Sequence, residues 1–275
     1  MTDKYAVIGN PIAHSKSPQI HKMFAEQTGQ DISYEAILAP LDGFATTVER
    51  LRMEGYKGCS VTLPFKQEAW RLAVPSPRAR DAQAVNTLKF ENEKIYGDNT
   101  DGIGLVKDIE ENLKTPLRNK QILLIGAGGA AYGVLHPLLA SAQTALVIYN
   151  RTFQNALDLK KSIDQNEKFQ RYSPKAVEFG KLGDAQFDVV INATSTGLTD
   201  SGIPLPFGIF APGALAYDLM YGRETPFMKF ARDHGASLVS DGLGMLVEQA
   251  AESFCIWREI RPNSTPVIAA LRKQR

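Results

Sequence analysis

The chain has few of the residues that would cross-link a small fold or hold a metal. Its 275 residues include only two cysteines and four histidines, and the histidines form no metal-spaced pair. Cys59 and Cys255 are too few and too far apart in the sequence to suggest a disulfide scaffold or a zinc site. We therefore expect free thiols, no metal site and a cytoplasmic location.

Long apolar runs and an excess of one charge are also missing. No apolar stretch reaches membrane-spanning length, and residues 1–4 lead into a candidate strand without the pattern of a signal peptide. Lys and Arg total 31 and Asp and Glu total 30, so the formal net charge is +1. This balance gives no electrostatic reason to bind nucleic acid or an anionic membrane. We expect a small-molecule substrate and either a monomer or a homodimer.

The composition is that of a folded chain long enough for two α/β domains. Apolar residues make up 44% and charged residues 22%, which argues against wholesale disorder. The length exceeds that of one ordinary α/β domain.

The clearest motif is a glycine-rich turn between two apolar runs. Residues 122–125 form a short apolar run, Gly126 to Ala131 the turn, residues up to Ser141 a helix-compatible stretch, and residues 145–149 a second run. In this context a G-x-G-x-x-G/A pattern indicates dinucleotide binding. Glycines allow a tight turn and let a pyrophosphate approach free N–H groups at a helix start. The alternative is a tight turn without a ligand.

The residues after the second run indicate which dinucleotide is bound. NAD sites usually have an acidic residue there, which accepts hydrogen bonds from the ribose 2′-OH. Here Asn150, Arg151 and Thr152 follow the run, and no carboxylate comes before Asp158. The planar fork of an arginine can pair with a 2′-phosphate and stack on adenine. The sequence therefore favours NADP, although Arg151 could also be a solvated surface charge.

Lys66 stands in an unfavourable place for a cation. Residues 58–63 read as a buried strand, and Pro64 then opens a helix with Lys66 in its first turn. The helix dipole is positive there, so a lysine at this position is a candidate for proton transfer. A surface lysine is the alternative.

Hydroxyls at another predicted helix start could hold a carboxylate. Ser17 and Pro18 are typical of an N-cap and a first helical position, so Ser15 and Ser17 lie beside free N–H groups. The alternative for Ser17 is a cap without a ligand.

Three further polar residues are predicted at positions that suit binding. Asn86 and Asp101 fall at strand ends, where ligands of α/β sheets gather, although Asp101 could simply cap the helix after it. Gln249 lies among apolar residues on a long helix and should have a hydrogen-bonding partner.

Eight motifs, taken together, resemble the shikimate dehydrogenase family. In chain order they are Gly9 to Pro11 with Ser15 to Pro18, Val61 to Lys66, Ala84 to Thr87, Asp98 to Gly102, Gly126 to Ala130, Asn150 to Thr152, Asn192 to Ser195, and Asp241 to Leu246. Each motif is weak alone, but eight in register are specific. The resemblance implies an oxidoreductase that reversibly reduces 3-dehydroshikimate to shikimate with NADPH, on the route to chorismate and the aromatic amino acids.

The resemblance also implies an α/β fold with two domains. The first is an N-terminal substrate domain with a mixed sheet, residues 1–101, completed by the C-terminal helices of residues 243–275. The second is a central Rossmann domain, residues 102–242, that binds NADP.

The same resemblance implies roles for particular residues. Lys66 and Asp101 would be the catalytic pair. The substrate carboxylate would be held by Ser15, Ser17 and Tyr221. The ring oxygens would be held by Thr62, Lys66, Asn86, Asp101 and Gln249. The cofactor would contact Gly126, Ala127, Gly128, Gly129, Ala130, Asn150, Arg151, Thr152, Leu219 and Gly242.

Two alternatives to the NADP-dependent enzyme follow from the same residues. One is a quinate/shikimate dehydrogenase that takes NAD, which usually has an acidic residue where this chain has Arg151. The other is a non-catalytic NADP-binding regulatory module, which predicts loss of the Lys66 and Asp101 pair. Asn155 stands where the family often has a second Arg or Lys, so the 2′-phosphate would depend more on Arg151.

Overall fold

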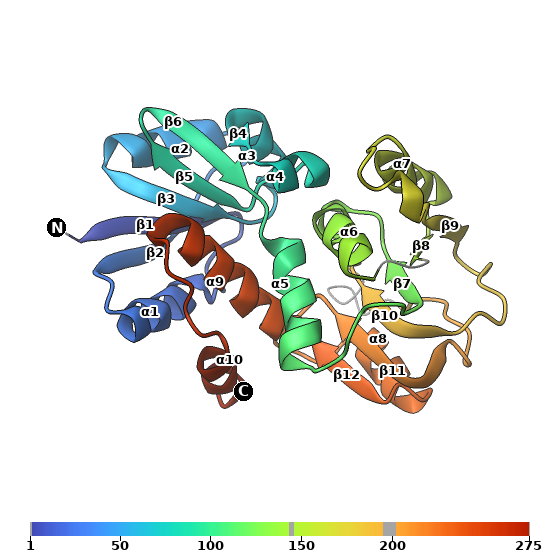
Figure 1. The fold of residues 1–275 in the computed structure, drawn as a ribbon. Helices are drawn as coiled ribbons and strands as arrows, with labels where there is room; N and C mark the ends of the chain where they lie inside the picture. Colours follow the sequence, from blue (N-terminus) through green and yellow to red (C-terminus); the bar gives the residue numbers. More distant parts are fainter. Residues whose placement is uncertain (1, 143–145, 195–201, 275) are drawn as a thin grey trace. The chain divides into compact units, whose positions relative to one another are not determined.

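The chain builds two separate six-stranded sheets, each in its own unit (Figure 1). The structure is a computed structural model that describes residues 2–142, 146–194 and 202–274. Unit 1 comprises Met1–Gly104 and Leu246–Arg275, and unit 2 comprises Leu105–Met245. The boundaries expected from the sequence, after residues 101 and 242, lie slightly before these limits.

The sheet of unit 1 is mixed, as expected. Its strand order is β2-β1-β3-β5-β6-β4, with β1 parallel to β2 and β3, and β5 antiparallel to β3 and β6. The bounds are β1 Asp3–Gly9, β2 Ile32–Leu38, β3 Tyr56–Val61, β4 Val74–Pro75, β5 Thr87–Glu91 and β6 Lys94–Asp98. β5 and β6 form a hairpin, and Asn92 and Glu93 adopt the positive φ angles that its tight turn needs.

Helices from both ends of the sequence pack on this sheet. They are α1 Ser17–Thr28, α2 Phe44–Met53, α3 Lys66–Leu72, α4 Pro77–Ala82, α9 Leu243–Arg258 and α10 Thr265–Arg272. Trp257 of α9 donates from its indole nitrogen to the carbonyl of Leu88 in β5 at 2.9 Å. Arg78 of α4 pairs with Asp98 at 2.6 Å and with Glu252 of α9 at 2.9 Å. These contacts attach α9 to the N-terminal sheet, as the expected completion by C-terminal helices requires.

A buried histidine lies among the aromatic side chains of unit 1. The ring of His21, on α1, stacks on Tyr34 with centroids 4.1 Å apart and lies 5.4 Å from Trp257. Neither of its ring nitrogens has a hydrogen-bond partner among the described residues. Burial lowers the pKa of His21 from 6.5 to about 3, because the imidazolium would lose its hydration.

We expect His21 to make the fold sensitive to acid. Below pH 6.5 the unfolded chain protonates this histidine, whereas the folded chain does so only near pH 3. The unfolded state then binds more protons, so the free energy of unfolding falls by about 1.4 kcal/mol per unit as the pH drops through this window. Between pH 7 and pH 5, His21→Phe should lose about 2 kcal/mol less than the wild type in urea unfolding. His14→Gln, at an exposed histidine, is the control and should keep the wild-type slope. A wild-type slope in His21→Phe would contradict this account.

The sheet of unit 2 is parallel throughout. Its order is β12-β11-β10-β7-β8-β9, which is the doubly wound order of a Rossmann domain. The strands are β7 Ile122–Ile125, β8 Leu146–Asn150, β9 Lys175–Glu178, β10 Phe187–Asn192, β11 Phe210–Asp218 and β12 Leu238–Asp241. The fold class expected from the sequence is confirmed. β9, a short strand at the sheet edge without a long apolar run, was not predicted.

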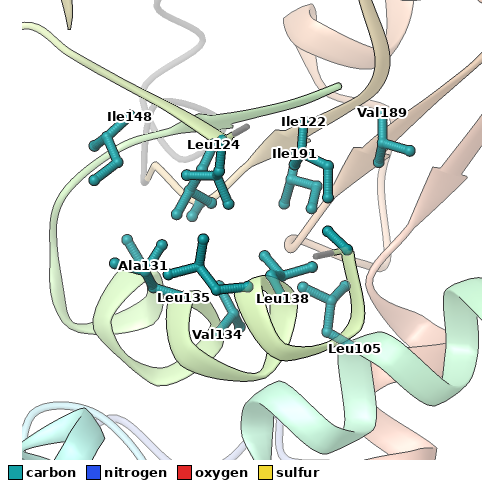
Figure 2. Packing of buried hydrophobic residues seen from close by; sticks show 14 of the residues in the cluster. Leu105, Ile122, Leu124, Ala131, Val134, Leu135, Leu138, Ile148, Val189 and Ile191 are labelled. Atoms are coloured by element: carbon teal, nitrogen blue, oxygen red, sulfur yellow. The ribbon is translucent and has the colours of Figure 1, made fainter. Parts of the chain in front are cut away.

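The helices of unit 2 cover both faces of its sheet. They are α5 Asp101–Lys107, which begins in unit 1, α6 Gly129–Ala142, α7 Phe153–Asp164 and α8 Pro226–Asp233, and a π-helix, Asp108–Asn112, follows α5. Figure 2 shows the apolar side chains of α6 pointing at the strand residues Leu124, Ile122 and Ile191. Leu123 and Ile125 alternate with these and face a second cluster that includes Phe227 of α8. Apolar burial on both faces explains the continuous apolar runs of the central strands.

Candidate active site

Lys66 and Asp101 lie together in unit 1. Lys66 is the first residue of α3 and Asp101 the first residue of α5. The ammonium of Lys66 donates to one carboxylate oxygen of Asp101 at 2.6 Å. The side chains are 24% and 10% exposed, so the pair is largely shielded but still within reach of a ligand. An ammonium held in this way can give a proton to a developing alkoxide.

Asn86 and Gln249 extend this pair into a polar cluster. The amide nitrogen of Asn86 donates to the second carboxylate oxygen of Asp101 at 2.9 Å. It also lies 3.2 Å from the side-chain oxygen of Gln249, on α9. The partner expected for Gln249 is therefore found, and it belongs to a segment far away in the sequence.

Topology brings these residues to one edge of the unit 1 sheet. β1, β3 and β6 run in the same direction, so their carboxyl ends share an edge, where the antiparallel β5 begins. The segments at this edge carry Ser15, Ser17, Thr62, Lys66, Asn86 and Asp101. Gly9 allows the close approach of β1 and β3, because a Cβ there would collide with the side chains of Thr62 and Ile12.

The predicted cap at Ser17 is wrong by one residue. Lys16 is the N-cap of α1, and its carbonyl accepts from Ile20 at 3.0 Å. Ser17 is the first residue of the helix, and its own N–H donates to the hydroxyl oxygen of Ser15 at 3.3 Å. The Ser17 side chain is therefore not used as the cap of this helix.

The glycine turn of unit 2 leaves open space at the start of α6. Gly126 has a φ of +106°, and a Cβ there would lie 3.1 Å from the carbonyl of Ala193, so this position requires glycine. Gly128 and Gly129 are exposed, and a Cβ at either would meet no described atom within 4 Å. Ala131 is fully buried and packs α6 against the sheet (Figure 2). The backbone over this helix start is therefore accessible to a phosphate.

Arg151 lies exposed between β8 and α7. Its guanidinium makes no hydrogen bond or ion pair with any other described residue. Asn150 donates from its side chain to the carbonyl of Thr152 at 2.8 Å, which closes the turn. Asp158, the nearest carboxylate along the chain, accepts from Gln154 at 2.9 Å. Glu178, the register partner of Asn150 on β9, pairs with Lys181 at 2.7 Å. Within the described part of the chain, the guanidinium at the end of β8 therefore stays available to a ligand, as a 2′-phosphate site requires.

The ends of β10 and β11 and the start of α8 are joined by a residue that sequence reasoning missed. The buried carboxylate of Asp218 accepts from the backbone of Met220 at 2.9 Å, from Asn192 at 3.0 Å and from Thr225 at 2.6 Å. Burial raises the pKa of Asp218 above its usual range. An aspartate at the end of an apolar strand was the available signal.

The remaining residues predicted to bind cofactor or substrate in unit 2, Leu219, Gly242 and Tyr221, lie near Asp218 in the sequence or at the end of the neighbouring strand β12. The N–H of Leu219 donates to the carbonyl of Asn192 at 2.9 Å. A Cβ at Gly242 would collide with the carbonyl of Leu219, so glycine is needed for the close approach of these chains. Tyr221 lies two residues after Leu219, also in unit 2. Ser195, part of one motif, lies outside the described residues.

Residues 2–142, 146–194 and 202–274 offer neither a metal cluster nor a membrane span. No group of three or more His, Cys, Asp or Glu side chains in this part of the chain could hold a metal ion. No helix in it is both long enough and apolar enough to span a membrane.

Three family models match the chain in order. Residues 7–88 match the shikimate dehydrogenase substrate binding domain, residues 107–199 match shikimate / quinate 5-dehydrogenase, and residues 242–272 match the shikimate 5′-dehydrogenase C-terminal domain.

Individual relatives agree along nearly the whole length. Shikimate dehydrogenase (NADP(+)) of Methylobacillus flagellatus is 57% identical over 98% of this chain and 99% of its own. The crystal structure of an Ael1 enzyme from Pseudomonas putida has a TM-score of 0.91 at 46% identity, covering 98% of each chain. Shikimate 5-dehydrogenase of Thermus thermophilus, in complex with NADP(H) and shikimate, has a TM-score of 0.85 at 32% identity, covering 99% of each. The chain belongs to the shikimate dehydrogenase family.

Proposed function

We propose that the chain catalyses the reversible, NADPH-dependent reduction of 3-dehydroshikimate to shikimate, on the route to chorismate and the aromatic amino acids. The observation that carries the proposal is the Lys66–Asp101 pair, 2.6 Å apart, at the edge where the carboxyl ends of the unit 1 strands meet. The names of relatives that are 50–57% identical support the same reaction.

The roles proposed for the polar residues around the substrate follow their chemistry. Ser15, Ser17 and Tyr221 would hold the carboxylate, because hydroxyls and helix-start N–H groups stabilise an anion. Thr62, Asn86 and Gln249 would hold ring oxygens. Their hydroxyl and amide groups can both donate and accept, as neutral ring hydroxyls require.

Lys66 is proposed as the proton donor. NADPH, when bound, supplies a hydride to the carbonyl carbon of the substrate. The oxygen of that carbonyl gains negative charge, and the ammonium of Lys66 gives it a proton. Asp101 holds the ammonium in place with one carboxylate oxygen and accepts from Asn86 with the other. In the reverse direction the neutral amine takes the proton of the alcohol.

The residues of unit 2 fit NADP. The open space over Gly128 and Gly129 suits a pyrophosphate at the start of α6, with Ala127 and Ala130 flanking it. Arg151, with no partner among the described residues, suits the 2′-phosphate, and Asn150 and Thr152 shape the turn around it. Leu219 and Gly242 would contact the cofactor at the ends of the neighbouring strands.

One assay tests this function. Purified protein is mixed with shikimate or quinate, crossed with NADP or NAD, and the absorbance of the reduced nicotinamide is followed. We expect the shikimate and NADP combination to have the highest kcat/KM, because Arg151 takes the place of the acidic residue of NAD enzymes. Faster turnover of quinate with NAD would favour the quinate/shikimate alternative. Absence of turnover in all four combinations, with NADP still bound, would favour a regulatory module.

The proposed location is the cytoplasm, and the proposed assembly is a monomer or homodimer. Cys59 is buried and Cys255 half-buried, and both are free thiols, as is usual in a reducing compartment.

A further inference from the structure

Four buried residues form a closed circuit of hydrogen bonds beside the Lys66–Asp101 pair. They are Asn86, Thr100, Ser253 and Thr87, and each is at most 2% exposed. Around the circuit the distances are 2.8 Å from Asn86 to Thr100, 3.2 Å from Thr100 to Ser253, 2.6 Å from Ser253 to Thr87, and 3.0 Å from Thr87 back to Asn86. Three members come from unit 1 segments around β5 and β6, whereas Ser253 comes from α9.

The side-chain oxygen of Asn86 shows which way the amide faces. The backbone N–H of Thr100 donates to it at 2.9 Å, and this donor cannot be reversed. The hydroxyl of Thr87 donates to it at 3.0 Å. These two donors fill both lone pairs of the amide oxygen. The amide nitrogen must then face Thr100 and Asp101, at 2.8 and 2.9 Å.

Counting hydrogens gives the circuit a single direction. Because Thr87 gives its hydrogen to Asn86, the 2.6 Å contact with Ser253 requires Ser253 to donate to Thr87. The hydroxyl of Ser253 also lies 3.0 Å from the carbonyl of Gln249, but the contact with Thr87 is shorter. The hydroxyl of Thr100 accepts from the amide nitrogen of Asn86 and lies 3.2 Å from Ser253. The amide oxygen of Asn86 is equally near at 3.2 Å but already has two donors, and the side-chain oxygen of Gln249 is farther away at 3.4 Å, so the Thr100 hydroxyl is assigned to donate to Ser253. Each hydroxyl then donates once and accepts once around the ring.

We propose that this ring makes Thr87 and Ser253 positioning residues for the reaction, by holding the Asn86 amide so that its remaining N–H lies on Asp101. Bonds that run in one direction around a buried ring polarise and strengthen one another. The ring therefore orients one carboxylate oxygen of Asp101, while Lys66 holds the other. The inference rests on the proposed function, because Asp101 matters here as the partner of the proton donor.

Breaking the ring at either hydroxyl should weaken the reaction. Without the hydroxyl of Thr87, the oxygen of Asn86 loses one of its two donors. Without Ser253, Thr87 loses the donor that directs its hydrogen to Asn86. In either case the amide becomes freer to rotate, and the N–H on Asp101 is held less firmly. The cofactor residues belong to unit 2, so the KM for NADP should not change.

The test uses four variants of the full chain. Thr87→Val and Ser253→Ala each remove a hydroxyl and should each lower kcat for shikimate about fivefold to tenfold, as expected for one buried hydrogen bond. Thr87→Ser keeps the hydroxyl and should stay within about twofold of the wild type. Thr47→Val is the matched control: this threonine is 7% exposed and donates to a backbone carbonyl at the start of α2, away from the ring. Its kcat should equal that of the wild type.

The double variant Thr87→Val/Ser253→Ala separates a ring from two independent contacts. If both hydroxyls serve one ring, removing the second lowers kcat little further. The kcat of the double variant should then lie within about twofold of that of the slower single variant. A loss equal to the product of the two single losses would overturn the proposal. So would a Thr87→Ser enzyme as slow as Thr87→Val, or single variants with wild-type kcat.

Two further measurements keep these outcomes distinct. Thermal unfolding of every variant shows whether it folds. If Thr87→Val does not fold, the proposal is judged on two other results: a lower kcat in Ser253→Ala and an unchanged kcat in Thr87→Ser. Wild-type turnover is measured first. An inactive wild type would refute the proposed function, whereas an active wild type with unaffected variants would refute only the ring.

Discussion

Replacement of Lys66 by alanine is expected to lower kcat on the order of a thousandfold or more, with the fold retained. The loss combines two effects. The developing alkoxide loses its proton donor, and Asp101 loses the ammonium that lies 2.6 Å from its carboxylate. The fold should survive because Lys66 begins a helix at a partly buried position and does not belong to the buried apolar clusters. Steady-state rates with shikimate and NADP give kcat, and circular dichroism checks the fold.

A second substitution at this position separates charge from proton transfer. Lys66→Arg keeps a cation beside Asp101, but a guanidinium does not give up its proton in proteins. We expect it to be nearly as slow as Lys66→Ala. The control is Lys22→Ala, which removes an exposed lysine from α1 in the same unit and should be fully active. Turnover like that of the wild type in Lys66→Ala would remove this residue from the mechanism.

Replacement of Arg151 by alanine is expected to raise the KM for NADP by roughly tenfold to a hundredfold and to leave the KM for NAD nearly unchanged. The reason is that a charge-assisted hydrogen bond to phosphate contributes about 1.5–3 kcal/mol, and only NADP carries the 2′-phosphate. Asn155, on the first turn of α7, is too short and uncharged to take over this interaction. Initial rates at varied NADP and NAD, with shikimate saturating, measure both constants.

The control for Arg151 is another exposed arginine of unit 2. Arg118 precedes β7, at the amino end of that strand, and the ligands of parallel sheets bind at the carboxyl ends. Arg118→Ala should change neither constant. An equal rise for both cofactors in Arg151→Ala would contradict the phosphate role and would point to a general effect on the turn.

Elements with a strong local pattern could be predicted closely. The apolar run of β7, the glycine turn and α6 lie where the sequence placed them, because strand length, glycine spacing and helix periodicity are all local signals. Thr225 and Pro226 are residue types typical of a helix start, and α8 does begin there, where the Thr225 hydroxyl accepts from the N–H of Met228 at 3.2 Å. Local chemistry was sufficient at each of these places.

Elsewhere local signals were weak or misleading. Ser17 looks like a cap, but hydrogen bonding of α1 begins one residue earlier, at Lys16, because N-cap preference is only a bias of about 1 kcal/mol. The edge strand β9 and the short α4 have too few apolar residues to show a period. Thr87 and Ser253 gave no sign of a shared role, since a serine on a helix and a threonine on a strand are commonplace.

The sequence by itself determined the family, the two α/β domains and the presence of a cation after β8, because these depend on motifs read along the chain. Only the tertiary structure decided that Asn86, Asp101 and Ser253 meet in one buried hydrogen-bonded cluster. The physical reason is that a hydrogen bond between residues 87 and 253 depends on how α9 packs on the sheet. That packing is set by many contacts at once, and no spacing in the sequence records it.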